Sequence, residues 1–160
     1  MSDTPSIILR SVAVADNDFL CAVYASTRAD ELAVTGWTDE QKAEFCQMQF
    51  TAQDAHYRQH YPTAEFSVIE HDGTPAGRLY VDRWSKEIRI MDIALLPTHR
   101  RHGIGTGLLR ALMDEARAGN KLLSSHVERM NPALRLYERL GFKMAEDKGV
   151  YLLMEWTPIR

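Results

Sequence analysis

The chain has 160 residues, of which 45% are hydrophobic, and a formal net charge of −3. A chain of this length can bury one proper core and is short for two, so a single domain over residues 1–160 is expected. The basic residues are dispersed apart from one turn, which argues against a nucleic-acid binder. No apolar run approaches the roughly 18 residues of a membrane span, and the chain opens with Met-Ser-Asp-Thr-Pro rather than with a charged segment followed by an apolar one. A cytoplasmic protein without a membrane partner is therefore expected.

The two cysteines and six histidines show no metal-ligand spacing. Cys21 and Cys46 lie in segments that read as helix and are interpreted as small buried hydrophobes. His56 and His60 are four residues apart on a possible helix, but no third ligand accompanies them. No metal cofactor is expected.

The N-terminal part of the chain predicts one strand and two helices. A strand over 7–12 precedes a helix over about 16–27, which acidic or amide side chains could cap. A second helix is expected over about 38–57, because Thr38 and Gln41 stand at capping-box spacing.

The middle of the chain predicts three strands. Two of them, over 66–70 and 75–84, flank the turn residues Asp72-Gly73, which accept positive φ angles and favour an antiparallel hairpin. The third strand, over 87–96, changes the phase of its apolar alternation after Ile90. That change indicates either a β-bulge or burial of both strand faces.

The C-terminal part predicts a helix over 101–118, a strand over 122–127 and a helix that Asn131 caps. A terminal hairpin closes at Lys148-Gly149, and the last strand covers 150–156. Strand, helix and strand in this order imply a right-handed crossover with locally parallel pairing. The whole order predicts a mixed α/β (α+β) fold, with one largely antiparallel central sheet and helices on both faces.

The most informative stretch covers residues 93–109, where an apolar strand runs through a basic, glycine-rich turn into an amphipathic helix. A helix start leaves backbone N–H groups without partners and carries a partial positive charge, so it can bind an anion. Gly103 and Gly105 would let a phosphate approach closely. Basic side chains surround them, namely His99, Arg100, Arg101 and His102. A phosphorylated ligand is therefore expected.

Two common phosphate-binding patterns fit this turn poorly. A P-loop needs Lys-Ser/Thr after its last glycine, whereas Gly105 is followed by Thr106. A dinucleotide fingerprint needs a glycine or alanine where Leu108 stands and an acidic residue about 20 residues further on. The better match is Arg/Gln-x-x-Gly-x-Gly/Ala directly after a strand that ends in Leu-Pro, met by Arg100, Gly103 and Gly105. This turn resembles that of the GNAT superfamily of acyl-CoA-dependent N-acyltransferases.

A second segment, residues 131–142, is similar to the fourth-helix signature of the same family, Asn-x-Ala-x-x-Leu-Tyr-x-x-Leu-Gly-Phe. Local chemistry agrees, because Asn131 is a good N-cap, Pro132 suits a first helical position and Gly141 can end the helix in a left-handed turn. Together the two resemblances cover roughly residues 88–157.

The resemblance implies where acetyl-CoA would bind. In the family, the fifth strand splays from the fourth, and the pantetheine arm bonds to the backbone of the fourth strand, here Ile93, Ala94 and Leu95. Asn131 would contact this arm or only cap its helix. The pyrophosphate would be surrounded by Arg100, Arg101, His102, Gly103, Ile104, Gly105 and Thr106.

The resemblance also implies the residues that move protons. Tyr137 occupies the family position of the acid that protonates the departing sulfur, and its alternative role is that of a core aromatic. His126 is the first candidate for the base, since some members carry a glutamate five residues before the Asn. Registering instead on Tyr137 selects Ser125. Asp92 is the next candidate base, and bulk water is the alternative to all of these.

The expected function is transfer of an acetyl group from acetyl-CoA to a primary amine of a small molecule or peptide. The alternative is a non-catalytic acyl-CoA-binding or sensor module of the same fold, which would not need Tyr137. A nucleotide-binding α/β domain would need the missing Lys-Ser/Thr or ribose-binding acid. The sequence leaves open the identity of the amine, the acyl-chain preference and whether the protein forms a homodimer.

Overall fold

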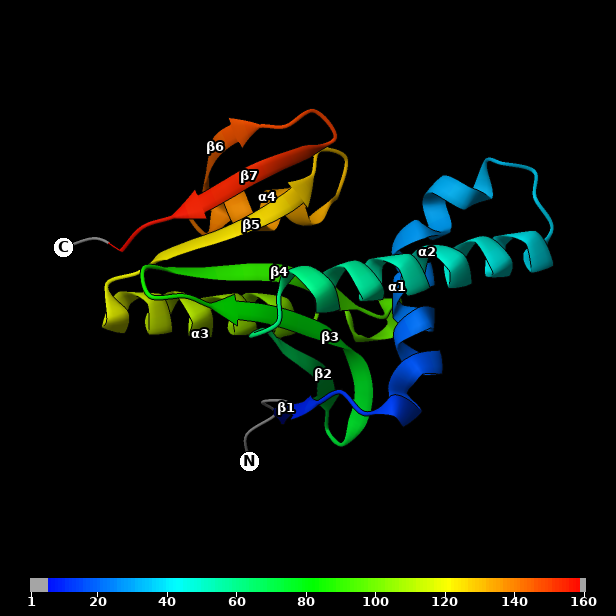
Figure 1. Ribbon diagram of the computed structural model, residues 1–160, viewed down its shortest axis with the longest axis horizontal. Coiled ribbons are helices and arrows are strands. Elements are labelled where there is room, and N and C mark those ends of the chain that lie inside the picture. The colour runs from blue at the N-terminus through cyan, green and yellow to red at the C-terminus, as the bar shows by residue number, and fades with distance from the viewer. Residues whose placement is uncertain (1–5, 159–160) are drawn as a thin grey trace. The chain divides into compact units, whose positions relative to one another are not determined.

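The computed structural model describes residues 6–158, which form a mixed α/β fold with seven strands and four α-helices (Figure 1). The strands are β1 (Ile7–Ser11), β2 (Glu65–His71), β3 (Thr74–Arg83), β4 (Glu87–Leu95), β5 (Leu122–Glu128), β6 (Lys143–Asp147) and β7 (Tyr151–Trp156). The helices are α1 (Asn17–Ala33), α2 (Asp39–His60), α3 (Ile104–Gly119) and α4 (Ala133–Arg139), with 3-10 turns at Val14–Asp16 and Pro97–His99. The strand order is β1-β2-β3-β4-β5-β7-β6.

Two compact units divide the chain and interleave along it. The first unit contains the described residues up to Leu79 together with Ala94–His102, and the second contains Tyr80–Ile93 and the residues from Gly103 onward. β3 passes from the first unit into the second, and β4 passes back. The expectation of a single domain stays a prediction.

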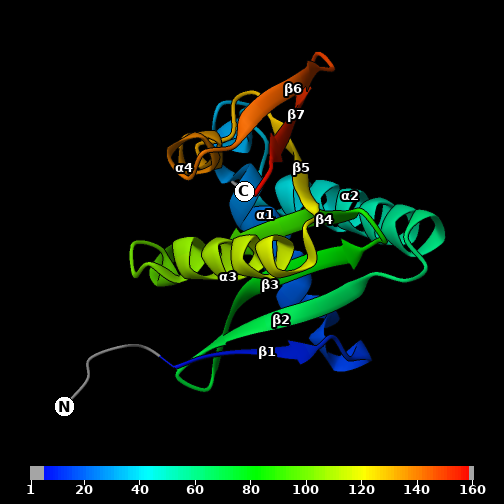
Figure 2. The ribbon, with the colours of Figure 1, turned by 90° about the vertical axis from the view of Figure 1, so that its left-hand side faces the viewer.

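In the first unit, β1 and β2 lie side by side and pair antiparallel, from Ile7 opposite His71 to Ser11 opposite Ser67 (Figure 2). The turn that leads from β2 to β3 has φ angles of 50° at Asp72 and 82° at Gly73. Two successive left-handed residues match the twist of a tight hairpin, which confirms the turn predicted from Asp-Gly.

The two helices of the first unit begin where the sequence predicts but end later than predicted. α1 was expected to end at about Thr27 but continues to Ala33, because its last turns are made of good helix formers and bury Leu32. α2 begins after Thr38 as expected, and both bonds of the capping box are present. Its end at His60 is three residues beyond the predicted one.

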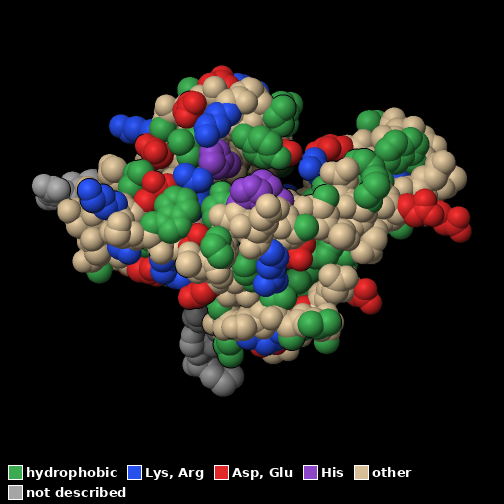
Figure 3. All heavy atoms as spheres, in the orientation of Figure 1, with side chains coloured by type: hydrophobic (Ala, Val, Ile, Leu, Met, Phe, Trp, Pro, Cys, Tyr) green, Lys and Arg blue, Asp and Glu red, His purple; other side chains and the backbone are tan. Residues whose placement is uncertain are grey.

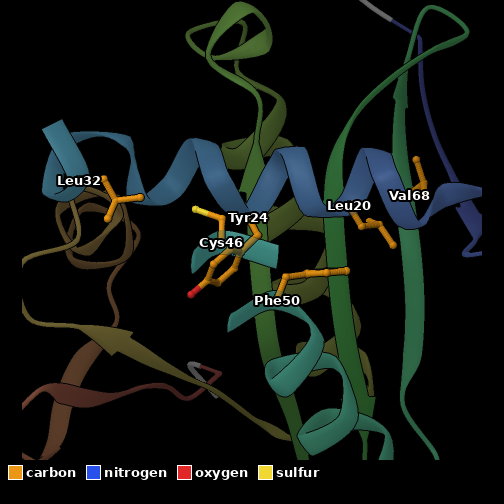
Figure 4. Close-up of a cluster of buried hydrophobic side chains, with 6 residues drawn as sticks. All are labelled: Leu20, Tyr24, Leu32, Cys46, Phe50 and Val68. Atoms are coloured by element: carbon orange, nitrogen blue, oxygen red, sulfur yellow. The ribbon is translucent and has the colours of Figure 1, made fainter. Parts of the chain in front are cut away.

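A cluster of buried hydrophobic side chains holds α1 and α2 to β2 (Figure 4). α1 contributes Leu20, Tyr24 and Leu32, α2 contributes Cys46 and Phe50, and β2 contributes Val68. The rings of Tyr24 and Phe50 lie 6.4 Å apart in a tilted arrangement. Cys46 is buried as expected, whereas Cys21 is only half-buried, and both thiols are free.

In the second unit, β5 pairs with β4 in parallel and with β7 antiparallel. The parallel pairing confirms the expected crossover through α3, which buries Leu109, Leu112 and Ala116. α3 begins at Ile104, so the predicted start at Arg101 is wrong. Arg101 and Gly103 adopt left-handed backbone angles, and a right-handed helix cannot include residues in that conformation.

The C-terminal hairpin of the second unit is confirmed. β6 pairs antiparallel with β7, and Gly149 provides a left-handed residue with a φ of 86° in the turn between them. The pairing shifts register between Met144 and Glu146. α4 ends at Arg139, and Gly141, with a φ of 100°, is the left-handed residue that was expected to follow it.

The surface and the helices add two observations. On the face that Figure 3 shows, Lys and Arg side chains are interspersed with Asp and Glu side chains. Among residues 6–158, no helix is long and apolar enough to cross a membrane.

Candidate active site

The turn before α3 has an unusual backbone. Pro97–His99 forms a 3-10 turn, and the next residues include Arg101 with a φ of 66° and Gly103 with a φ of 76°. Left-handed angles are uncommon for a residue with a side chain, so Arg101 holds a strained conformation. The chain therefore changes direction sharply at the end of this turn, immediately before α3 begins.

The start of α3 has no cap from its own side chains. Its N-cap residue is Gly103, and the first helical hydrogen bond runs from the Gly107 N–H to the Gly103 carbonyl over 2.9 Å. The N–H groups of Ile104, Gly105 and Thr106 precede that bond and point out of the helix start. A Cβ built on Gly105 would have only Leu136 Cδ2 nearby, at 3.8 Å, so the surface there is open enough for a ligand to reach the backbone. This geometry suits an anion.

The strand that leads into the turn lies close to β3. A Cβ on Gly77 would lie 2.1 Å from the Ala94 carbonyl oxygen, so only glycine fits there. The Leu96 N–H donates to the Ala76 carbonyl, and alternation therefore directs the main-chain groups of Ala94 toward β3 as well. Three backbone positions were predicted to bind pantetheine. The main-chain groups of Ile93 and Leu95 point to the edge of β4 away from β3, whereas those of Ala94 point toward β3.

The side chain of Arg100 is anchored to this strand. Its Nε donates to the Leu95 carbonyl over 2.9 Å. That bond uses the carbonyl of Leu95 and leaves its N–H for a ligand. It also holds the guanidinium group at the base of the turn, where its other N–H groups can meet phosphate oxygens.

Three histidines meet at the same turn within the first unit. The Nδ1 atoms of His71 and His99 lie 2.9 Å apart, so one ring donates to the other. The His102 ring lies 5.3 Å from the His71 ring, centroid to centroid. Burial lowers the pKa of His99, and the neighbouring His71 and His102 lower it further. No group of three or more ligating side chains in residues 6–158 has metal-binding geometry.

The pairing of β4 with β5 ends early. Its register runs from Glu87 opposite Leu122 to Ile90 opposite Ser125, and Figure 1 shows β5 turning away from β4 beyond that point. β4 residues 91–95 are all half-buried, so the phase slip in the sequence coincides with half-burial along both faces. The separation begins within a residue or two of both predicted bases.

Tyr137 of α4 is buried beside β5. Its hydroxyl lies 3.3 Å from Ser125 Oγ, and its ring meets Phe142 edge-on at 5.0 Å. Burial raises the pKa of Tyr137 to about 12, and the Asp92 carboxylate contributes in the same direction while the bond to Ser125 opposes it. The phenol therefore keeps its proton at neutral pH.

The other predicted proton carriers lie on opposite faces of the sheet that β4 and β5 form. Ser125 faces Tyr137, so its neighbour His126 points to the opposite face. Ile90 is the partner of Ser125, which places Asp92, two residues further on, on the Tyr137 face. The two alignments that select Ser125 or His126 thus select residues on opposite faces of β5. Ser125 is the one that contacts the Tyr137 hydroxyl.

Asn131 performs the capping role that was one of its two predicted roles. Its Oδ1 accepts a hydrogen bond from the Ala133 N–H over 2.9 Å, and Pro132 occupies the position before α4. The side chain is exposed and its amide nitrogen remains able to donate.

Sequence reasoning missed the polar partners of His126. Glu87 and Arg89 of β4 and Ser124 of β5 bond to one another and, through Arg89, to His126. The only signal in the sequence is a pair of charges that alternates with Ile88 and Ile90. That pattern does not distinguish an internal network from a solvated strand face.

The chain matches the model of the Acetyltransferase (GNAT) family over residues 28–142. The protein belongs to this family. A streptothricin acetyltransferase of Streptomyces lavendulae is 38% identical over 91 residues, which are 54% of this chain and 48% of that protein. The match thus spans about half the length of that relative.

Solved structures show the same fold. The PaiA N-acetyltransferase of Thermoplasma acidophilum, crystallised with coenzyme A, has a TM-score of 0.71 at 19% identity, covering 96% of this chain and 99% of that one. The ribosomal-protein-S18-alanine N-acetyltransferase of Escherichia coli has a TM-score of 0.63 at 18% identity, covering 95% and 94% of the two chains.

Proposed function

We propose that this protein is an N-acetyltransferase that moves the acetyl group of acetyl-CoA to a primary amine. Family membership supports acetyl transfer, and the observation that carries the catalytic reading is Tyr137. A buried phenol with a pKa of about 12, bonded to Ser125 beside the point where β4 and β5 separate, is a proton donor at neutral pH. A module that only binds acyl-CoA has no need for such a group.

The chain offers suitable groups for the phosphates and the pantetheine arm of acetyl-CoA. The N–H groups of Ile104, Gly105 and Thr106 would bind phosphate oxygens, assisted by the side chains of Arg100, Arg101 and His102 and by the open backbone at Gly103. Ile93 and Leu95 would bond the amide groups of the arm, and Asn131 would add its amide nitrogen. When bound, acetyl-CoA supplies the acyl group as an activated thioester.

Two protons have to move in the reaction. Tyr137 holds one at its hydroxyl and would give it to the sulfur that leaves, while Ser125 keeps the phenol oriented. The proton of the amine has two proposed acceptors, His126 and Asp92, and they lie on opposite faces of β5. A third acceptor is water. With His126 as the acceptor, the amine proton would leave on the face opposite Tyr137, and with Asp92 it would leave on the same face as Tyr137.

The acceptor is proposed to be a small-molecule or peptide amine, because one relative is named for acetylation of streptothricin. A homodimer, a cytoplasmic location and the absence of nucleic-acid and membrane partners stay predictions.

The test is release of free thiol from acetyl-CoA with a panel of amines that includes streptothricin, an amino acid, a polyamine and a peptide N-terminus. Tyr137→Phe should keep its affinity for acetyl-CoA and lose about 10²- to 10⁴-fold in turnover, the usual effect of removing a positioned acid. Tyr151→Phe, an exposed tyrosine of β7, is the matched control and should keep full turnover. Binding without turnover on any amine would favour the sensor module, and an active Tyr137→Phe would make Tyr137 a core aromatic.

A further inference from the structure

Four side chains form a continuous hydrogen-bonded group on the β4 and β5 face opposite Tyr137. Arg89 Nε donates to Ser124 Oγ over 2.7 Å, and Arg89 Nη2 donates to Glu87 Oε2 over 2.9 Å. Ser124 Oγ in turn donates to the same Glu87 oxygen over 2.5 Å. The remaining end of the guanidinium group, Nη1, lies 3.3 Å from His126 Nδ1. Glu87 and Ser124 thus hold Arg89 in one position against His126.

The chemistry of arginine decides the tautomer of His126. A guanidinium group carries only donors, so the atom that meets Nη1 has to accept. His126 Nδ1 therefore presents its lone pair to Arg89, and the single proton of the neutral imidazole sits on Nε2. Nε2 is itself buried and has no hydrogen-bond partner among residues 6–158. A buried N–H without a protein partner requires an acceptor from outside the chain, which is either a water molecule or a ligand.

The electrostatic surroundings keep this ring neutral. Burial is the largest cause that lowers the pKa of His126, followed by the positive charges of Arg89 on β4 and Lys148 in the β6–β7 hairpin. Glu146 of the hairpin and Glu87 of β4 oppose them with a smaller effect. The charges on both packed elements thus leave the neutral form in place at pH 7.

We propose that Arg89 is a positioning residue that fixes His126 as the Nε2–H tautomer, so that His126 donates a hydrogen bond to the acyl carbonyl oxygen of bound acetyl-CoA. The proposal rests on the proposed function for the identity of the ligand. His126 follows Ser125, the last residue of β5 that pairs with β4, so it stands where these two strands begin to separate. A carbonyl oxygen can only accept, which matches an N–H donor without a protein partner.

One consequence concerns the base. An imidazole whose Nδ1 is occupied by a guanidinium group and whose Nε2 already carries a proton has no free lone pair for the amine proton. His126 then is a hydrogen-bond donor and not the proton acceptor. The amine proton passes to Asp92 or to water.

The decisive measurement is the imidazole spectrum of protein labelled with 15N-histidine. Long-range correlations between ring nitrogens and carbon-bound protons distinguish the two neutral tautomers, and a His126→Gln variant assigns the signals. At pH 8 the His126 ring of the free protein should show the Nε2–H pattern. In Arg89→Met the Nδ1–H pattern should appear beside it, and the pKa of His126 should rise because a positive charge has been removed. Arg83→Met, which removes an arginine paired with Glu115 instead, should leave the spectrum unchanged.

The ligand is tested with the same signals. Acetyl-CoA should move the Nε2 resonance by more than CoA does, because CoA lacks the acyl carbonyl. A pure Nδ1–H spectrum in the unmodified protein overturns the proposal without any variant, and equal effects of acetyl-CoA and CoA overturn the carbonyl contact. These readouts need no turnover, so a protein that acetylates no amine but shows both signals would refute the proposed function and keep the role of Arg89.

Kinetics provide the second readout. If His126 donates, His126→Gln should keep part of the activity through its amide N–H, and the rise of kcat/KM with pH should persist. If His126 is the base, the same variant should remove that rise. The comparison is made with two amines of well-separated pKa, because ionisation of the amine gives a similar rise.

Discussion

The helices α2 and α3 begin in opposite ways. At the start of α2, Thr38 Oγ1 accepts from the Gln41 N–H over 3.1 Å, and Gln41 Oε1 accepts from the Thr38 N–H over 2.9 Å. At the start of α3, a glycine stands in the cap position and no side chain of the helix accepts from the first N–H groups. The first start satisfies its own backbone, and the second leaves its N–H groups pointing outward.

The difference separates a helix start that satisfies its own backbone groups from one that leaves them available to an anion. An unsatisfied helix start costs free energy that an N-cap would recover, about 1 kcal/mol. A protein that leaves such a start open gains an anion site in exchange. The left-handed angle at Arg101 likewise occurs in the chain just before α3, where the helix start is open. We therefore expect changes at α3 to act on binding and changes at α2 to act on stability.

The largest effect is expected for Gly105→Val. The new side chain meets only the tip of Leu136, so the fold should remain, but it would cover the N–H groups of the helix start. Affinity for CoA should fall by at least about 100-fold, equivalent to about 2.7 kcal/mol. Ala111→Val, an exposed position further along α3, is the control and should bind normally. Titration calorimetry measures both, and normal CoA binding by Gly105→Val would show that the α3 start is a structural one.

A second, smaller effect is expected from pH. The lowered pKa of His99 makes that ring neutral at pH 7 in the free protein, and phosphate charges nearby would favour its protonated form. Binding would then take up protons, so CoA affinity should increase as the pH falls from 8 to about 6, by less than about tenfold per pH unit. Below both the free and the bound pKa the increase should stop. Pantetheine, which lacks phosphates, should show no such dependence, and His99→Asn should remove it for CoA.

The smallest effect is expected for Thr38→Ala. It removes one side of the capping box of α2, which should lower the free energy of unfolding by about 1 kcal/mol. Denaturant unfolding measures the loss. CoA affinity should not change, and a variant that binds CoA more weakly would show that the two helix starts are not independent.

Most elements of this fold could be predicted because they depend on local chemistry. The Asp72-Gly73 hairpin, the capping box at Thr38 and the stop at Gly141 are each determined by a few neighbouring residues. The predicted helix boundaries are wrong where a tertiary contact or an unusual backbone angle decides them. α1 extends to Ala33 because good helix formers continue beyond Thr27 and because Leu32 packs into the core, and the sequence does not reveal the second of these causes. α3 starts late because Arg101 adopts an angle that its residue type disfavours.

The candidate site was predictable to the same degree. The glycine-rich turn before α3, which is proposed to bind phosphate, could be located because glycines and basic residues are adjacent in the chain. Tyr137 could be located through the helix signature around it. Their conformation could not be predicted in detail. The main-chain direction of Ala94 depends on its contact with Gly77, 17 residues earlier, and sequence periodicity contains no information on that contact.

The sequence by itself determined the family of the chain, the order of its strands and helices, and the segments proposed to bind the phosphates and to protonate the thiolate, because each depends on residues close together in the chain. The tertiary structure decided which face of the β4–β5 pair each predicted proton carrier occupies. It placed Ser125 and Asp92 on the side of Tyr137, and it set His126 against Arg89 on the other side. Strand register and side-chain burial control those positions, and both arise only when β4, β5 and α4 pack together.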